Sequence, residues 1–188
     1  IAAPAYAGIP VTQRGISTSV TIVTGSEDPN KLDSTINWDA LARLSGTLVF
    51  VMAWKGMKDI VSALTSRGMS KERSAALIQW GTTAKQKVVT GPINEIVDRG
   101  VDAKIGAPVA LVVGEVADLR KSMSWFDQRP LFGKKILVTR ARTQASRLVS
   151  HLEDLGAEVF EYPTIEIVPP RDHGPLDKAL RNIQHYDW

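Results

Sequence analysis

Residues 47–52 read TLVFVM, a nearly uninterrupted apolar run of strand length. Directly after it, apolar residues recur at helical spacing from Met57 to Leu64, until Gly68 interrupts the pattern. A continuous apolar run is typical of a strand buried on both faces, and the helical spacing predicts an amphipathic helix packed beside it. The sequence therefore predicts a strand, loop and helix unit of an α/β protein.

Similar short runs lie on both sides of this unit. Candidate strands cover residues 18–23, 75–80, 86–90 and 109–113, and candidate helices cover residues 38–44, 92–100 and 115–123. Asn37 is expected to cap the first of these helices, because its side chain accepts a hydrogen bond from an unpaired helical N–H. The pattern indicates the α/β class.

The composition changes at residues 125–135, a short polar connector around Leu131 and Phe132 that we interpret as a domain linker. Beyond it, strands are predicted at 135–139, 159–162 and 165–168, and helices at residues 148–155, closed by Gly156, and 176–183. Strand, helix and strand at this spacing predict the start of a parallel βαβ unit.

Composition excludes several classes of function. The chain of 188 residues has no cysteine, which excludes disulfides, thiolate nucleophiles and cysteine-ligated zinc and is compatible with a reducing cytoplasm. The net charge of +3 comes from scattered Lys and Arg, which argues against a nucleic-acid footprint. The apolar runs fall short of the roughly 20 residues that span a bilayer. The isolated His151, His173 and His185 predict surface histidines and no metal site.

Turns at the ends of apolar strands are the candidate binding positions. Met52 closes one strand, Gly81 follows another, and Ala107, Pro108 and Ala110 open a third. Open α/β sheets bind ligands at the carboxyl edge of their strands, where small residues and exposed main-chain groups let an adenine ring and ribose approach. In the alternative interpretation, Met52 fills a gap in the core and Gly81 is only a turn residue.

Five segments in order resemble the uroporphyrinogen-III C-methyltransferase family over residues 1 to about 126. They are APAYAGIPVTQR at 3–14, SVTIVTG at 19–25, TLVFVM at 47–52, WGTTAKQKVVTG at 80–91 and residues 107–125. The third is similar to the family's Thr-Leu-Val-Phe-Tyr-Met, and the fourth to its Gly-Thr-x-x-x-Gln-x-Val-x-x-Gly. Gln13 and Ser26 stand where the family usually has His.

Residues past the connector resemble the start of uroporphyrinogen-III synthase. The resemblance rests on RPLFGKKILVTRAR at 129–142, LGAE at 155–158 and YPTIEI at 162–167. The expected organisation is a carboxyl-terminal part of a tetrapyrrole methyltransferase at 1–126, a linker at 127–134 and an amino-terminal part of the synthase at 135–188.

The first resemblance implies a mixed sheet flanked by helices and an S-adenosyl-L-methionine site in a cleft between two α/β domains. It also implies transfer of two methyl groups to uroporphyrinogen III, giving precorrin-2 for siroheme and cobalamin. Met52, Gly81 and Ala110 match the family's cofactor contacts, and Arg14 its substrate-carboxylate contact, with surface pairing as the alternative for Arg14. The family's Gly-rich loop and Pro-Gly-x-Thr-Ser segment are absent from these residues, so only part of a cofactor site is expected, and no catalytic residue is assigned.

Further expectations concern partners and alternatives. The resemblance implies a cytoplasmic homodimer without nucleic-acid or membrane partners. Arg140 ends a predicted strand and is either a ligand contact or a surface arginine. The alternative functions are another precorrin methyltransferase and a dimerisation or scaffolding fragment without activity of its own.

Overall fold

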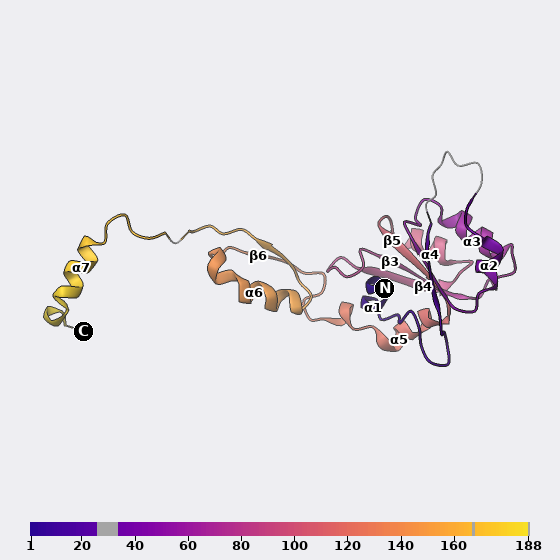
Figure 1. Ribbon diagram of the computed structural model, residues 1–188, viewed down its shortest axis with the longest axis horizontal. Coiled ribbons are helices and arrows are strands. Elements are labelled where there is room, and N and C mark those ends of the chain that lie inside the picture. The colour runs from indigo at the N-terminus through magenta and orange to yellow at the C-terminus, as the bar shows by residue number, and fades with distance from the viewer. Residues whose placement is uncertain (26–33, 167, 188) are drawn as a thin grey trace.

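The computed structural model describes residues 1–25, 34–166 and 168–187. In Figure 1, a sheet with helices around it lies at one end, a smaller unit of β6, β7 and α6 lies in the middle, and α7 lies at the other end. Among the described residues, no helix is long and apolar enough to cross a membrane.

Five strands form the larger sheet, in the order β1-β2-β5-β3-β4. Their bounds are β1 Val20–Thr24, β2 Thr47–Val51, β3 Ser74–Gln79, β4 Lys87–Pro92 and β5 Val109–Val113. β1 and β2 are parallel, whereas β5 runs antiparallel to both β2 and β3. β1, β2 and β3 therefore all point the same way and end at one edge of the sheet. This is the mixed sheet that the resemblance implied.

The two faces of the sheet carry separate cores. On one face, Leu48, Phe50, Leu77 and Leu111 are fully buried under α2 (Trp38–Arg43), α3 (Met57–Thr65) and α4 (Ile96–Asp102). On the other face, the strands pack against Ala7 and Ile9, which follow α1 (Ala2–Tyr6), and against η1 (Glu115–Leu119). Burial on both faces explains why residues 47–52 read as a continuous apolar run.

The helices begin and end largely where the pattern predicted. Asn37 Oδ1 accepts a hydrogen bond of 2.9 Å from the Ala40 N–H, which confirms the predicted cap of α2. α3 buries Met57, Ile60, Val61 and Leu64 on one face, as their spacing indicated. The predicted helix at residues 115–123 is a 3₁₀ turn, η1, followed by the short α5 (Arg120–Met123).

The predicted helix at residues 92–100 is displaced. Pro92 is the last residue of β4, paired with Ser74, and the helix spans Ile96–Asp102. Proline is tolerated there because β4 is an edge strand whose outer side needs no N–H donor. Gly100 lies inside this helix, at a position without room for a side chain, because a Cβ would lie 2.5 Å from Leu77 Cδ1.

The second part holds the predicted parallel pair of strands. β6 (Lys135–Val138) and β7 (Glu158–Glu161) are parallel and joined by α6 (Arg142–Asp154). α6 ends at Asp154, and Gly156 follows its C-cap with φ +96° and an N–H that donates to the Glu153 carbonyl at 2.8 Å. This confirms the βαβ unit.

The prediction of a strand at residues 165–168 is wrong for the three of these residues that the structure describes. Ile165, Glu166 and Val168 lie outside any strand, and Ile167 lies outside the described residues. Ile165 and Val168 are 63% and 64% exposed, as expected for apolar residues outside a packed sheet. α7 (Gly174–Arg181) follows, close to the helix predicted at 176–183, and η3 (Ile183–His185) extends it.

The connector between the two parts contains the turn η2 (Phe126–Gln128). Phe126 is only 5% exposed, and its ring contacts those of Tyr6 and Phe132 edge to face. The Leu131 N–H donates to the Leu155 carbonyl at 2.9 Å. The connector therefore contacts both the part that holds the five-stranded sheet and the part that holds β6 and β7.

Candidate functional site

The strand register brings Met52, Gly81 and Ala110 to one edge of the sheet. Met52 directly follows β2 and Gly81 lies two residues after β3. Ala110 pairs with Ile78 near the start of β5, and the Trp80 N–H donates to the Pro108 carbonyl at 3.3 Å. β1 ends at the same edge, where the Gly25 N–H donates to the Val51 carbonyl at 2.7 Å. We call this the carboxyl edge.

The backbone of the carboxyl edge is strained. Met52, Trp80 and Thr82 have φ of 54°, 49° and 72°, the left-handed region that side-chain-bearing residues rarely adopt. Each such residue costs about 1–2 kcal/mol relative to a right-handed conformation. Strain of this kind gathers where a binding surface requires a particular backbone path. Three examples at one edge make it the candidate binding surface.

A buried glutamine holds the loop after β3. The Gln86 side chain is 4% exposed, and its Oε1 accepts from the Thr82 N–H at 3.1 Å. Its Nε2 donates to the Tyr6 carbonyl at 3.2 Å. The Thr83 hydroxyl adds a hydrogen bond of 2.8 Å to the Trp80 carbonyl. We call Trp80–Gln86 the edge loop, and these contacts fix its shape.

The surface at this edge combines exposed apolar side chains with small residues. Met52 and Trp80 are 64% and 46% exposed, although both are large and apolar. Gly81 has no room for a side chain, because a Cβ would lie 2.6 Å from the Ala3 Cβ of α1. Ala110 is half-buried. Such a surface suits a flat, partly apolar ligand that also bonds to main-chain groups.

Arg14 lies at the opposite edge. It belongs to a hairpin in which Gln13 and Ser17 exchange backbone hydrogen bonds of 2.9 Å, and the chain enters β1 just after it. Arg14 is exposed and lines a recess of about 450 Å³ with Thr12, Gln13, Ser17 and Thr18. A five-residue strand separates the two edges by about 15 Å, so the structure does not bring Arg14 to Met52, Gly81 or Ala110.

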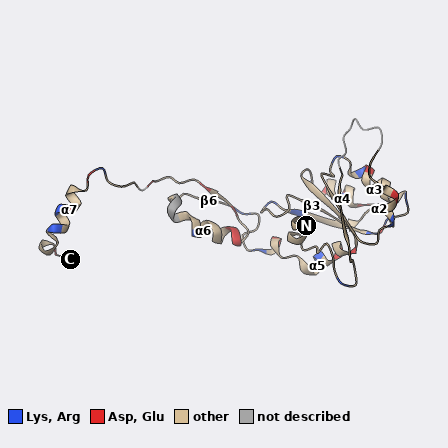
Figure 2. Ribbon diagram, viewed as in Figure 1, with Lys and Arg blue, Asp and Glu red and all other residues tan. Residues whose placement is uncertain are grey.

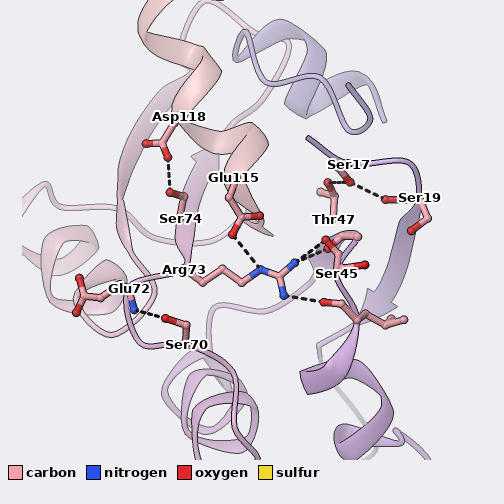
Figure 3. Close-up of polar contacts among 12 residues, drawn as sticks. Ser17, Ser19, Ser45, Thr47, Ser70, Glu72, Arg73, Ser74, Glu115 and Asp118 are labelled. Atoms are coloured by element: carbon pink, nitrogen blue, oxygen red, sulfur yellow. Dashed lines mark hydrogen bonds and ion pairs between the residues drawn. The ribbon is translucent and has the colours of Figure 1, made fainter. Parts of the chain in front are cut away.

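Arg73 organises this opposite edge (Figure 3). Its guanidinium donates to the Leu44, Ser45 and Gly46 carbonyls at 2.7, 3.2 and 2.6 Å. Its Nε lies 3.8 Å from Glu115 Oε1. Arg73 and Glu115 line a recess of about 770 Å³, but the donors of Arg73 are directed at the protein itself. We interpret Arg73 as a clamp on the turn between α2 and β2.

The remaining candidates add no second centre. Within the described part of the chain, no three His, Asp or Glu residues cluster as metal ligands would. His151, His173 and His185 are exposed. Arg140 is exposed just after β6, and Ser26 lies outside the described residues. Basic and acidic residues both occur in each of the two parts of the chain (Figure 2).

Sequence reasoning missed three residues of the carboxyl edge. Trp80 and Thr82 carry the strained backbone, and no local pattern distinguishes them from ordinary turn residues. Gln86 could have been found from the family resemblance, because it matches the glutamine of the Gly-Thr-x-x-x-Gln segment. Its buried hydrogen bonds to Thr82 and Tyr6 give that position a structural reason.

Comparison with protein families matches both parts of the chain. A model of tetrapyrrole (corrin/porphyrin) methylases matches residues 1–97, and one of uroporphyrinogen-III synthase HemD matches residues 146–188. The first range includes Met52 and Gly81 and ends before Ala110.

Several curated proteins are similar in sequence. A porphyrin biosynthesis protein HemD of Ruminiclostridium josui is 36% identical, over 100% of this chain and 37% of that protein. A uroporphyrinogen-III C-methyltransferase of Bacillus subtilis is 35% identical over 87% of this chain and 34% of its own length. An S-adenosyl-L-methionine-dependent uroporphyrinogen III methyltransferase of Methanosarcina barkeri is 40% identical over 63% of this chain and 47% of its own. The chain thus spans about a third to a half of these relatives.

Solved structures share the fold. A cobalt precorrin-4 methyltransferase superposes with a TM-score of 0.55 at 17% identity, over 62% of this chain and 48% of that one. A uroporphyrin III C-methyl transferase of Thermus thermophilus superposes with a TM-score of 0.52 at 21% identity, over the same shares. At these identities the likeness shows the fold alone.

Proposed function

Because the chain belongs to the tetrapyrrole (corrin/porphyrin) methylases, we propose that its carboxyl edge forms part of an S-adenosyl-L-methionine site. The protein that contains it would methylate carbons of uroporphyrinogen III, giving precorrin-2. Residues after the connector would belong to a fused uroporphyrinogen-III synthase, in keeping with the family match at 146–188. The siroheme and cobalamin branch of tetrapyrrole synthesis is the proposed setting.

The observation that carries the proposal is the gathering of strained residues beside Gly81 and Ala110. Met52, Trp80 and Thr82 hold left-handed conformations at the ends of two parallel strands. The exposed side chains of Met52 and Trp80 offer apolar surface to an adenine ring, and Gly81 leaves the main chain open to close approach. The residues present therefore fit the nucleoside portion of the cofactor.

When bound, the cofactor supplies an electrophilic methyl group on its sulfonium. The electron-rich pyrrole carbon of the substrate is the nucleophile, so no protein nucleophile is needed. The task of this chain is to hold the donor in one orientation, because alignment of reactants is a large part of such catalysis. Gln86 and the strained backbone serve this task by fixing the edge loop in advance.

Isothermal calorimetry with S-adenosylhomocysteine tests the proposal. The sample is the protein in which this chain occurs, at full length, followed by turnover with uroporphyrinogen III. We expect saturable binding and a dimethylated product identified by mass and NMR, which also separates the reaction from that of another precorrin methyltransferase. A full-length protein that ignores the nucleoside and leaves uroporphyrinogen III unchanged contradicts the proposal and supports the scaffolding alternative.

The proposed homodimer, cytoplasmic location and substrate contact of Arg14 rest on the family resemblance. Arg14 is exposed beside its recess, as a carboxylate contact requires. Replacing Arg14 by Gln is expected to raise the KM for uroporphyrinogen III and to leave the S-adenosylhomocysteine Kd unchanged. Analytical ultracentrifugation tests the dimer.

A further inference from the structure

The edge loop contacts the second part of the chain directly. Lys85 Nζ lies 2.5 Å from Oε1 of Glu158, the first residue of β7. The Glu158 side chain is only 22% exposed, whereas that of Lys85 is 52% exposed. β7 also anchors to the connector, because the Glu158 N–H donates to the Lys134 carbonyl at 2.8 Å. An ion pair thus joins the loop beside Gly81 to the sheet of the synthase-like part.

A second set of contacts reaches the same loop through α1. The Tyr6 carbonyl accepts the Gln86 side chain, and the Tyr6 ring packs against Trp125 and Phe126 at centroid distances of 5.2 and 4.8 Å. The Trp125 indole N–H donates to the Ala5 carbonyl at 3.0 Å. The connector residue Phe132 completes the cluster against Phe126 at 5.6 Å.

The connector is in turn fitted to the second part. A Cβ on Gly156 would lie 2.9 Å from the Arg129 Cβ and 3.2 Å from the Phe132 backbone, so the two segments are in close contact. The Arg129 guanidinium stacks over the rings of Trp125 and Phe126 at 4.8 and 5.0 Å. Contacts through the connector therefore link β7 and α6 to α1 as well as to Lys85.

We propose that the synthase-like part braces the edge loop, with Lys85 and Gln86 as positioning residues for the cofactor. The loop would hold its strained conformation at Trp80 and Thr82 partly because Glu158 and the connector support it. This inference rests on the proposed function only where it concerns the cofactor, because the bracing itself is a property of the loop.

The exposure of each side chain determines how much its substitution should change the edge loop. A half-exposed ion pair contributes little, so breaking Lys85–Glu158 is expected to change loop opening and cofactor affinity about two- to fivefold. Gln86 is buried, and its loss leaves an unpaired N–H and carbonyl. Replacing Gln86 by Glu keeps an acceptor for the Thr82 N–H but sets a carboxylate oxygen against the Tyr6 carbonyl. We therefore expect Gln86→Glu to lower the affinity for the cofactor about tenfold.

A charge-exchange cycle on the full-length protein tests the brace. The variants are Lys85→Glu, Glu158→Lys and the double exchange. Lys71→Glu is the control, because Lys71 is exposed and precedes β3 at the opposite edge. The first readout is hydrogen exchange of the edge-loop amides at Thr82, Thr83, Lys85 and Gln86, compared with amides of β3. The second readout is the Kd for S-adenosylhomocysteine at low and at high salt.

Each single variant is expected to speed edge-loop exchange and weaken binding about two- to fivefold, while β3 stays protected and Lys71→Glu has no effect. The double exchange should restore both values, and high salt should abolish the differences. Edge-loop exchange that is unchanged in both single variants, or a double exchange that restores neither value, overturns the brace. If the single variants speed hydrogen exchange of the edge loop but the protein never binds the nucleoside, the brace is supported and the proposed function is contradicted.

Discussion

Met52 offers a measurement of the strain at the carboxyl edge. Its φ of 54° lies in the left-handed region, and its side chain is 64% exposed, so truncating the side chain removes little buried surface. Replacing Met52 by Ala keeps the strain, whereas replacing it by Gly relieves about 1–2 kcal/mol. Glycine also stabilises the unfolded chain by about 0.4–1 kcal/mol relative to alanine. Met52→Gly is therefore expected to equal Met52→Ala in stability or to exceed it by up to about 1.5 kcal/mol.

Ser62 supplies the control, because it is exposed in the interior of α3. At that site Ser62→Gly is expected to be about 1 kcal/mol less stable than Ser62→Ala, the ordinary cost of glycine in a helix. Urea unfolding of the four variants is followed by tryptophan fluorescence, to which Trp38 and Trp54 contribute from their positions against the main core. If glycine destabilises at Met52 as much as at Ser62, the edge carries no strain and the reasoning is refuted.

Other variants probe single contacts, each checked by urea unfolding of the same chain. Asn37→Ala is expected to cost about 1 kcal/mol by removing the cap of α2, and Asn37→Asp to retain it. Arg73→Met removes three hydrogen bonds to carbonyls and is expected to lower the free energy of unfolding by about 2–3 kcal/mol. Arg73→Lys should lose more than half as much, because one ammonium cannot replace the planar guanidinium. Equal stability of the unchanged chain and both variants would contradict the clamp. Gly81→Ala should destabilise through its clash with Ala3, and adding Ala3→Gly should restore part of the loss; no rescue would show that the clash is not the cause.

Local patterns in the sequence predicted the elements that local forces determine. The apolar run at 47–52 and the spacing from Met57 to Leu64 correspond to β2 and α3. Asn37 caps α2 because its short amide reaches an N–H three residues away. The meeting of Met52 and Gly81 was also predictable, since strands of one direction end on one side of a sheet, whereas Ala110 reaches this edge only because β5 runs antiparallel to its neighbours.

Other features depend on contacts between distant residues. The insertion of β5 between β2 and β3 is set by pairing across long stretches of chain, which no window of sequence reports. Pro92 has the signal of a helix start, but its pairing with Ser74 keeps it in β4. The run at 165–168 has the composition of a strand, yet Ile165 and Val168 lie outside every strand of the described residues and are largely exposed. The left-handed backbone of Trp80 depends on the packing of the whole edge loop.

Binding of the nucleoside at the carboxyl edge would alter the backbone amides of that edge. Hydrogen exchange of the full-length protein with and without S-adenosylhomocysteine tests it most directly. Bound nucleoside is expected to bring new protection to residues 52–54, 80–83 and 107–110 and to leave residues 12–18 unchanged. Protection only of amides at residues 12–18, or of amides that line the recess beside Arg73, would contradict binding at the carboxyl edge.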